Sequence, residues 1–159
     1  MKGVYTLLFR ILKTMQIGIG GLGVIRFEKG IYAYTGSALG RGASSLECRI
    51  RRHLSEKKKI FWHIDYLLAH EKSRIIEVVC AKTNQKVECE VFKNLSRRSK
   101  VTIPVKRFGA SDCRSKCDSH LCHIKATAEE ALQIIMECYQ EARQEPKRCK
   151  GKVLQHFDV

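Results

Sequence analysis

The sequence predicts an α+β fold: a small, twisted, mixed β-sheet flanked by helices, with a further helix near the C-terminus. Apolar runs of strand length alternate with segments in which apolar residues recur at helical spacing. Of the 159 residues, 44% are hydrophobic, which is enough to build a core at this chain length. Only two residues are proline and 8% are aromatic, so the chain is not a low-complexity linker.

The first half of the chain carries most of the expected strands. Residues 4–12 are a β-rich apolar run and form the first strand. The glycines within 18–23 indicate a turn with a short strand on either side. Residues 23–28 and 31–36 are expected to form a strand pair. Further on, residues 74–81 are almost continuously apolar, which predicts a central strand covered on both faces.

Helical spacing predicts the remaining elements. Helices are expected over residues of about 44–57, 60–70, 85–97 and 128–143. Thr83 or Asn84 can cap the third helix, and Thr127 followed by Glu130 forms a capping box for the last.

The stretch before the last helix differs from the rest. Residues 98–126 are expected to be irregular and basic. We therefore expect one domain over residues 1–126, including a Cys/His-rich segment at 108–123. Residues 127–159 would add a C-terminal helix and a basic tail.

Charge suggests the kind of partner. Thirty lysines and arginines against 16 acidic residues give a net charge of +14, which attracts polyanions, nucleic acid before anionic membrane. Basic clusters at 57–59, 97–98 and 147–152 can together follow a phosphate backbone. No apolar run approaches the roughly 18 residues that a membrane-spanning helix needs. We expect a cytoplasmic protein that binds DNA rather than RNA, and we expect no membrane partner.

The helix expected at 44–57 brings polar side chains to its apolar side. At about 100° per residue, Arg49 and His53 fall on or beside the stripe formed by the apolar residues. Arg51 and Arg52 fall well away from it, on the expected solvated face. A guanidinium near a core needs a partner or a role. For each residue taken alone, a snorkelling arginine and a satisfied core histidine are the more common explanations.

A carboxylate and two phenols extend this set. Glu88 lies inside the buried sector of the third expected helix, whereas Glu90 lies opposite, on the solvated side. Tyr5 and Tyr34 lie on strands, and Gly36 ends the strand of Tyr34, where it lets a phosphate or another backbone approach. The set suits metal-assisted phosphodiester hydrolysis. The structural alternative for Glu88 is an ion pair, for instance with Arg49.

These residues carry a resemblance to a known family. They lie in segments that resemble the motifs of the GIY-YIG nuclease superfamily: Gly3-Val4-Tyr5, Tyr34-Thr35-Gly36, Leu46 with Arg49 and His53, and Val87-Glu88. The closer resemblance is to a mainly archaeal branch, long known as a domain of unknown function, whose members are sometimes fused to a base-excision glycosylase. Five segments of the chain resemble motifs of that branch, at residues 32–39, 62–67, 88–90, 108–113 and 119–121.

The resemblance implies a role for each matching residue. Tyr5 and Tyr34 would flank the scissile phosphate, one of them as general base or orienter of water. Arg49 would contact the phosphate, and His53 would assist proton transfer or bind phosphate. Glu88 would hold Mg²⁺ or Mn²⁺.

Other residues are candidates for accessory roles. Gly36 and Ser37 would let the phosphate approach the backbone. His63, Asp65 and Tyr66 on the second helix either extend the site or belong to a packed helix with polar exposed positions. Asp112 and His120 are further candidates for the cleft.

Eight cysteines without a secretory signal do not suggest a disulfide framework. Cys113, Cys117, His120 and Cys122 offer enough ligands for a zinc ion, with free thiols as the alternative. Cys48, Cys80, Cys89 and Cys138 lie in apolar or helical contexts and are expected to be small buried hydrophobes.

Two main functions from different classes follow, beside a third hypothesis of a nucleic-acid enzyme of other chemistry that uses His120 and the cysteines. The first is a divalent-metal-dependent endonuclease that hydrolyses DNA phosphodiesters, in repair for example. The second is a nucleic-acid-binding module on the same fold that does not cut and holds a structural zinc ion. The oligomeric state does not follow from the sequence.

Overall fold

A computed structural model describes residues 1–110 and 113–151, and it confirms the α+β class. Eight strands, four α-helices and two short 3₁₀ turns follow one another in these residues. Their order is β1 Gly3–Ile11, β2 Met15–Gly18, η1 Gly20–Leu22, β3 Val24–Phe27, β4 Gly30–Ala38, η2 Gly42–Ser44, α1 Leu46–Leu54, α2 His63–Leu68, β5 Ser73–Lys82, α3 Glu88–Ser96, β6 Val101–Thr102, β7 Leu121–Ile124, α4 Ala128–Glu141 and β8 Lys147–Arg148.

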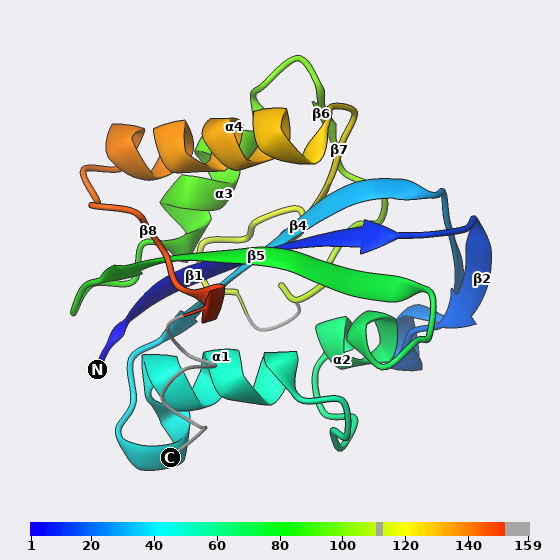
Figure 1. The fold of residues 1–159 in the computed structure, drawn as a ribbon, viewed down its shortest axis with the longest axis horizontal. Helices are drawn as coiled ribbons and strands as arrows, with labels where there is room; N and C mark the ends of the chain where they lie inside the picture. Colours follow the sequence, from blue (N-terminus) through cyan, green and yellow to red (C-terminus); the bar gives the residue numbers. More distant parts are fainter. Residues whose placement is uncertain (111–112, 152–159) are drawn as a thin grey trace.

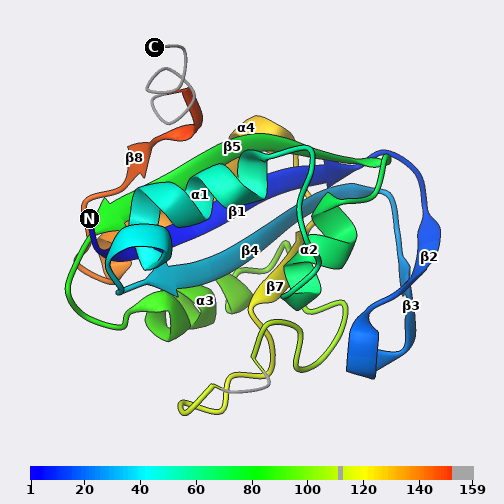
Figure 2. The ribbon, with the colours of Figure 1, turned by 90° about the horizontal axis from the view of Figure 1, so that it is seen from below.

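One six-stranded sheet organises the molecule, in the order β6-β7-β4-β1-β5-β8 (Figure 1). Every strand pairing in it is antiparallel, so the expected mixed sheet is an antiparallel one. Strand β1 pairs along all nine residues with β4 and with β5, with one irregularity between Leu8 and Phe9. β2 and β3 form a separate two-stranded sheet at one end of the molecule (Figure 2).

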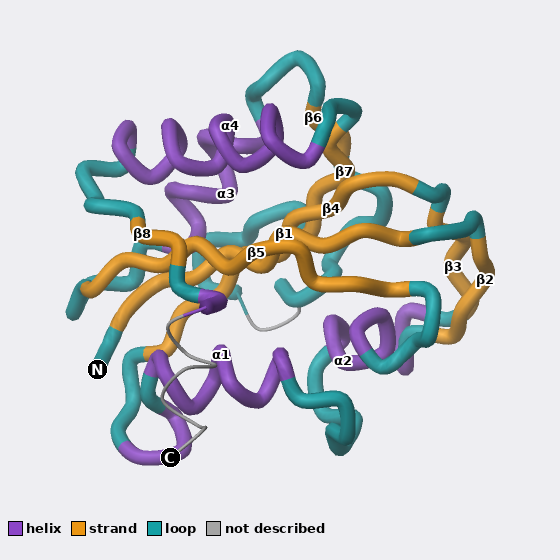
Figure 3. Tube along the Cα trace, in the orientation of Figure 1, coloured by secondary structure: helices purple, strands orange, loops and turns teal. Residues whose placement is uncertain are grey.

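The helices form layers on both faces of the sheet. α1 and α2 cover one face, and α3 and α4 cover the other (Figures 1 and 3). The alternation of side chains along β1 divides the core in the same way. Tyr5 and Leu7 belong to the cluster that includes Ile50 of α1, whereas Val4 and Leu8 belong to the cluster that includes Phe92 of α3 and Ile135 of α4.

The pairing of two strands differs from the expectation. The strand over 24–27 pairs with residues 15–18 and not with the strand after it. That next strand, β4, instead pairs with β1, because Glu28 and Lys29 turn the chain back toward the main sheet. β5 is covered on both faces, as expected, and lies between β1, which pairs with it along its length, and β8, which pairs with only two of its residues.

The second half of the chain also departs from the expected boundaries. α3 begins at Glu88 with Val87 as its N-cap, so Thr83 and Asn84 do not cap it. The segment expected to be irregular, 98–126, contains β6 and β7. The run over β7 is only four residues long, too short for an alternating pattern to stand out. As expected, Thr127 caps α4 by accepting a hydrogen bond from the Glu130 amide.

None of the helices in the described part of the chain is long and apolar enough to cross a membrane.

A buried polar contact attaches α4 to the sheet. The Tyr139 hydroxyl lies 2.9 Å from Thr6 Oγ1 and donates to the carbonyl of Val79 at 3.3 Å. Thr6 Oγ1 also lies 3.0 Å from Thr35 Oγ1. One phenol of α4 therefore contacts β1 and β5, and it reaches β4 through Thr6.

We expect Tyr139→Phe to lower the free energy of unfolding by about 1–2 kcal/mol, because it removes buried hydrogen bonds while keeping the ring. Urea denaturation followed by circular dichroism measures the change. Gln140→Ala on the exposed side of the same helix is the control and should change stability by less than about 0.5 kcal/mol. An equal effect of the two substitutions would contradict the proposed link between α4 and the sheet.

Candidate functional site

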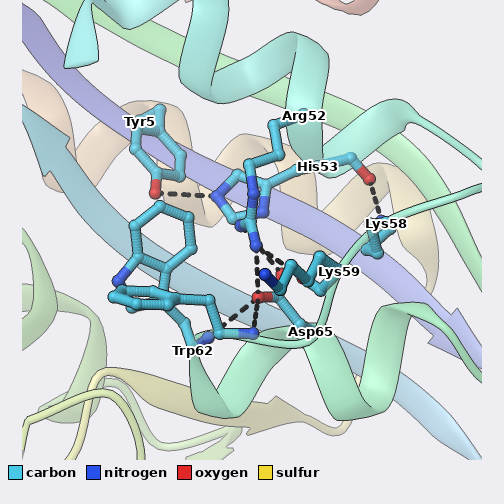
Figure 4. A network of polar contacts seen from close by, with 8 residues as sticks. Tyr5, Arg52, His53, Lys58, Lys59, Trp62 and Asp65 are labelled. Carbon is cyan, nitrogen blue, oxygen red and sulfur yellow. Dashed lines mark hydrogen bonds and ion pairs between the residues drawn. The ribbon is translucent and has the colours of Figure 1, made fainter. Parts of the chain in front are cut away.

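The centre of the candidate site is a contact between β1 and α1. The Tyr5 hydroxyl lies 2.9 Å from Nε2 of His53, and the two ring centroids are 5.3 Å apart (Figure 4). Tyr5 is brought there by the alternation of β1, and His53 by its position in the last turn of α1, one turn beyond Arg49. Both side chains are buried, and His53 is only 1% exposed.

Burial keeps both members of this pair neutral. It lowers the pKa of His53 to about 3, so the imidazole carries no charge at neutral pH. Burial also raises the pKa of Tyr5 well above its usual range, the Tyr34 phenol raises it further, and the Arg49 guanidinium opposes the rise. With the imidazole proton on Nδ1, Tyr5 donates its hydrogen bond to Nε2. Among the described residues, His53 Nδ1 has no hydrogen-bond partner.

Arg49 lies beside this pair with part of its hydrogen-bonding capacity unused. Its Nη1 donates to the carbonyl oxygen of Ser37 at 2.8 Å, and its guanidinium lies 4.9 Å from the centroid of the Trp62 ring. Its Nε is buried and has no partner among the described residues. A half-buried guanidinium with a free N–H is suited to receive an anionic oxygen.

Two glycines shape the site around the tyrosines. A Cβ at Gly36 would lie 2.7 Å from the Tyr5 hydroxyl oxygen, closer than real Cβ atoms come. Gly109 has φ of +69°, and a Cβ there would lie 2.7 Å from Cε2 of Tyr34. Only glycine suits these two positions while the tyrosines keep their places.

Arg52 differs from the expectation that it would be solvated. It donates two hydrogen bonds to Asp65, at 3.1 and 2.8 Å, and its guanidinium lies 4.2 Å from the Trp62 ring centroid (Figure 4). Asp65 is fully buried and also accepts from the backbone amides of Phe61 and Trp62. The expectation was wrong because Asp65 of α2 and Trp62 contact the Arg52 side chain, which a helical wheel of α1 alone does not reveal.

The other accessory candidates have structural contacts. Asp65 pairs with Arg52 and holds the start of α2. His63 Nδ1 accepts a hydrogen bond from the Gly109 amide at 2.9 Å, and its ring packs against Phe108. Tyr66 lies where a Cβ at Gly20 would meet it, so it faces the β2–β3 turn. Asp112 lies outside the described residues.

Glu88 is the first residue of α3. Its neighbours Val87 and Cys89 pack in the core cluster of α3 and α4. The carboxylate is 4% exposed; Oε1 lies 3.7 Å from the Lys86 ammonium, and Oε2 is buried without a partner among the described residues. Its ion-pair partner is therefore Lys86 and not Arg49. Glu90 is exposed, as expected.

Three cysteines and a histidine meet at the start of α3. Ligand atoms of Cys89, Cys113, Cys117 and His120 all lie within 4.8 Å of one another, so the cluster could hold a metal ion such as zinc. The expected set contained Cys122 in place of Cys89. Cys122 is instead fully buried in β7, where burial raises the pKa of its thiol, and it packs as a small hydrophobe.

The basic clusters are only partly free to bind a partner. Arg98 pairs with Glu137 and Glu141, and Arg148 pairs with Glu77. Lys57, Lys59 and Arg97 are exposed. Lys58 donates to the His53 carbonyl at 2.5 Å, and burial lowers its pKa to about 8.

Sequence patterns alone did not assign three residues that complete these sites. Trp62 contacts both Arg49 and Arg52 and is the chain's single tryptophan. Gly109 was expected only as a turn, and Cys89 only as a buried hydrophobe. The sequence offers one indication that Cys89 has a role in a site: it directly follows Glu88, a candidate site residue.

Comparison with known proteins gives one match. Residues 4–144 match a protein-family model described as a domain of unknown function, DUF123. The matched stretch includes Tyr5, His53, Glu88 and the Cys/His cluster. No curated protein and no solved structure matches the chain significantly.

The buried neutral His53 should make stability depend on pH. Its folded pKa is below its unfolded pKa, so the unfolded chain takes up the proton first as the pH falls below about 6.5. The contribution of His53 is complete above that pH and declines toward pH 3. Between pH 6.5 and 4.5, above the range in which Asp65 titrates, the loss should be roughly 2 kcal/mol.

Urea denaturation at several pH values measures this loss, with His53→Gln as the comparison because glutamine can still accept from Tyr5 but does not titrate. The variant should lack this part of the pH dependence. Parallel stability curves for the two proteins between pH 6.5 and 4.5 would show that His53 is not buried in its neutral form.

Proposed function

The chain belongs to the DUF123 family, and from that premise and the geometry of its sites we propose that it is a divalent-metal-dependent endonuclease that hydrolyses phosphodiester bonds in DNA. One observation carries the proposal. The neutral, hydrogen-bonded Tyr5–His53 pair lies next to Gly36 of β4 and beside an arginine whose Nε has no partner among the described residues. A proton acceptor and an anion-binding donor are what hydrolysis of a phosphodiester needs.

In this proposal the pair prepares the attacking water. The water donates a proton to the Tyr5 hydroxyl oxygen while Tyr5 passes its own proton to Nε2 of His53. The low pKa of the buried imidazole disfavours a lasting imidazolium, so this proton is held only as the reaction proceeds. Arg49 donates from Nε to a non-bridging phosphate oxygen and stabilises the charge that develops there. Gly36 lets the Tyr5 hydroxyl approach strand β4 closely.

Glu88 fits the Mg²⁺ or Mn²⁺ that the family resemblance implies. Its Oε2 is a buried oxygen without a partner in the part of the chain that the structure describes, and these ions prefer carboxylate oxygens and keep several waters. When bound, such an ion neutralises charge on the scissile phosphate and on the leaving oxygen. The weak 3.7 Å contact between Lys86 and Oε1 leaves the carboxylate available to it.

The charge of the chain supports DNA as the substrate. A net charge of +14 favours a polyanion, and the exposed Lys57, Lys59 and Arg97 are free to contact phosphates. A cytoplasmic location and a role in DNA repair, both expected from the sequence, belong to the same proposal.

A second candidate is a nucleic-acid-binding module on the same fold that does not cut. The observation that favours it is the Cys/His cluster, which resembles the structural zinc sites of binding modules more than a catalytic centre. The deep burial of Tyr5 and His53 is consistent with a purely structural role for that pair. This module would bind with an affinity that falls steeply as salt is added.

We expect Glu88→Gln and Arg49→Ala each to lower the rate of DNA cleavage at least 100-fold, because the first weakens binding of the proposed metal ion and the second removes the guanidinium that would contact the scissile phosphate. The measurement uses labelled duplex, flap, junction and single-stranded DNA, and RNA of matching structure, with Mg²⁺ and with Mn²⁺. DNA binding, measured in parallel, should change by less than about tenfold.

The matched controls are Glu90→Gln on the exposed side of α3 and Arg51→Ala on the exposed side of α1. Both should cleave within about twofold of the unaltered protein. Cleavage that survives both site substitutions would contradict the assigned roles. Salt-sensitive binding without cleavage in either metal would support the binding module instead.

A further inference from the structure

We infer that Cys89, Cys113, Cys117 and His120 form a structural zinc site that fastens the loop before β7 to the first turn of α3. This site is separate from the proposed ion at Glu88 and does not depend on phosphodiester cleavage. It also differs from the ligand set that sequence spacing suggests, since Cys89 comes from a distant part of the chain and replaces Cys122.

The separations between ligand atoms suit one tetrahedral ion. Cys89 Sγ lies 3.3 Å from Cys113 Sγ and 3.7 Å from His120 Nε2, and all four ligand atoms are within 4.8 Å of one another. Zinc bonds of about 2.3 Å to sulfur and 2.0 Å to nitrogen place tetrahedral ligands roughly 3.5–3.8 Å apart. The two sulfurs are too far apart for a disulfide, in which they are about 2.05 Å apart.

Each ligand is positioned by its backbone. The Lys116 amide donates to the Cys113 carbonyl, and this turn, with Lys116 at φ of +52°, brings Cys117 back toward Cys113. The His120 amide donates to the Phe108 carbonyl at 2.8 Å, and its carbonyl accepts from Thr35 of β4 at 3.0 Å. The ligand positions are therefore set by backbone contacts in addition to the side chains themselves.

The surroundings indicate a structural and not a catalytic ion. Cys89, Cys117 and His120 are buried and Cys113 is half-buried, so four protein ligands close the site and leave no open position for water. Three thiolates and an imidazole favour zinc over Mg²⁺ or Ca²⁺, which prefer oxygen ligands.

A metal ion bound here would stabilise two parts of the local structure, the first turn of α3 and the loop before β7. α3 starts at Glu88 without a side-chain cap, because its N-cap residue is Val87. Cys89 lies in that uncapped turn, so a metal bond through its sulfur holds the turn in place of a cap. Among the described residues from 103 to 120 there is no strand or helix, and a loop of this length needs a further constraint. On the proposed function, the same tether fixes Glu88, the residue before Cys89.

The decisive comparison is between Cys89→Ser and Cys122→Ser. Protein purified under reducing conditions should contain about one zinc ion per chain by elemental analysis. Cys122→Ser should keep this zinc, whereas Cys89→Ser should lose most of it. Replacement by Co²⁺ should give the intense absorption of thiolate-bound tetrahedral cobalt in the unaltered protein and in Cys122→Ser only.

Stability provides a second readout. A strong chelator should lower the Tm of the unaltered protein and of Cys122→Ser, and should leave the Tm of Cys89→Ser unchanged. If Cys89→Ser does not fold, the half-buried Cys113→Ser takes its place. Glu88→Gln should retain its zinc, which separates this inference from the nuclease proposal.

Three results would each overturn the inference. The first is less than about 0.2 zinc per chain after reconstitution in the absence of oxygen. The second is loss of zinc from Cys122→Ser with retention in Cys89→Ser. The third is a Cys89–Cys113 disulfide found by mass spectrometry in the reduced, purified protein.

Discussion

The rest of the structure depends on the pairing of β1 along both of its edges. Because all nine residues are paired with β4 on one edge and β5 on the other, each side chain has a fixed face, and a shift of one residue would exchange the two cores. Tyr5 then meets His53 on one face, while the next residue, Thr6, meets Tyr139 on the other. The polar contacts that define the candidate site and those that hold α4 thus come from neighbouring residues of one strand.

The α1 and α2 face combines two different solutions to burying polar groups. Tyr5 and His53 are buried in their neutral forms, because burial raises the pKa of Tyr5 and lowers the pKa of His53. Asp65 is buried as an ionised carboxylate that pairs with the partly exposed Arg52 and accepts from backbone amides, with an aromatic ring beside the guanidinium. Arg49 belongs to neither group, because its Nε is left without a partner among residues 1–110 and 113–151.

Local sequence patterns predicted the helices and strands better than they predicted which of these elements lie next to one another. The α+β class, the strand of Tyr5, the helix of Arg49 and His53 and the Thr127 cap follow from periodicity and capping chemistry, which act over a few residues. Strand pairing, the ion pair of Arg52 with Asp65 and the replacement of Cys122 by Cys89 depend on contacts between distant segments. For instance, Cys122 lies only two residues from His120, yet the alternation of β7 and its place in the core remove it, while Cys89 arrives from 31 residues away.

Gly36 and Gly109 shape the site by the side chains that they lack. Each leaves room for a tyrosine ring that a single added carbon would meet at 2.7 Å. Gly18 and Gly21, in the hairpin region, have open space around them instead. Single substitutions at Gly18 and Gly21 are therefore sterically tolerated. A substitution at Gly36 must be accompanied by a shift or replacement of Tyr5, and one at Gly109 by a shift or replacement of Tyr34. Changes in the ligands that the proposed site binds would then arise from substitutions at its edge. The residues in contact with Tyr5 and Tyr34 would stay the same.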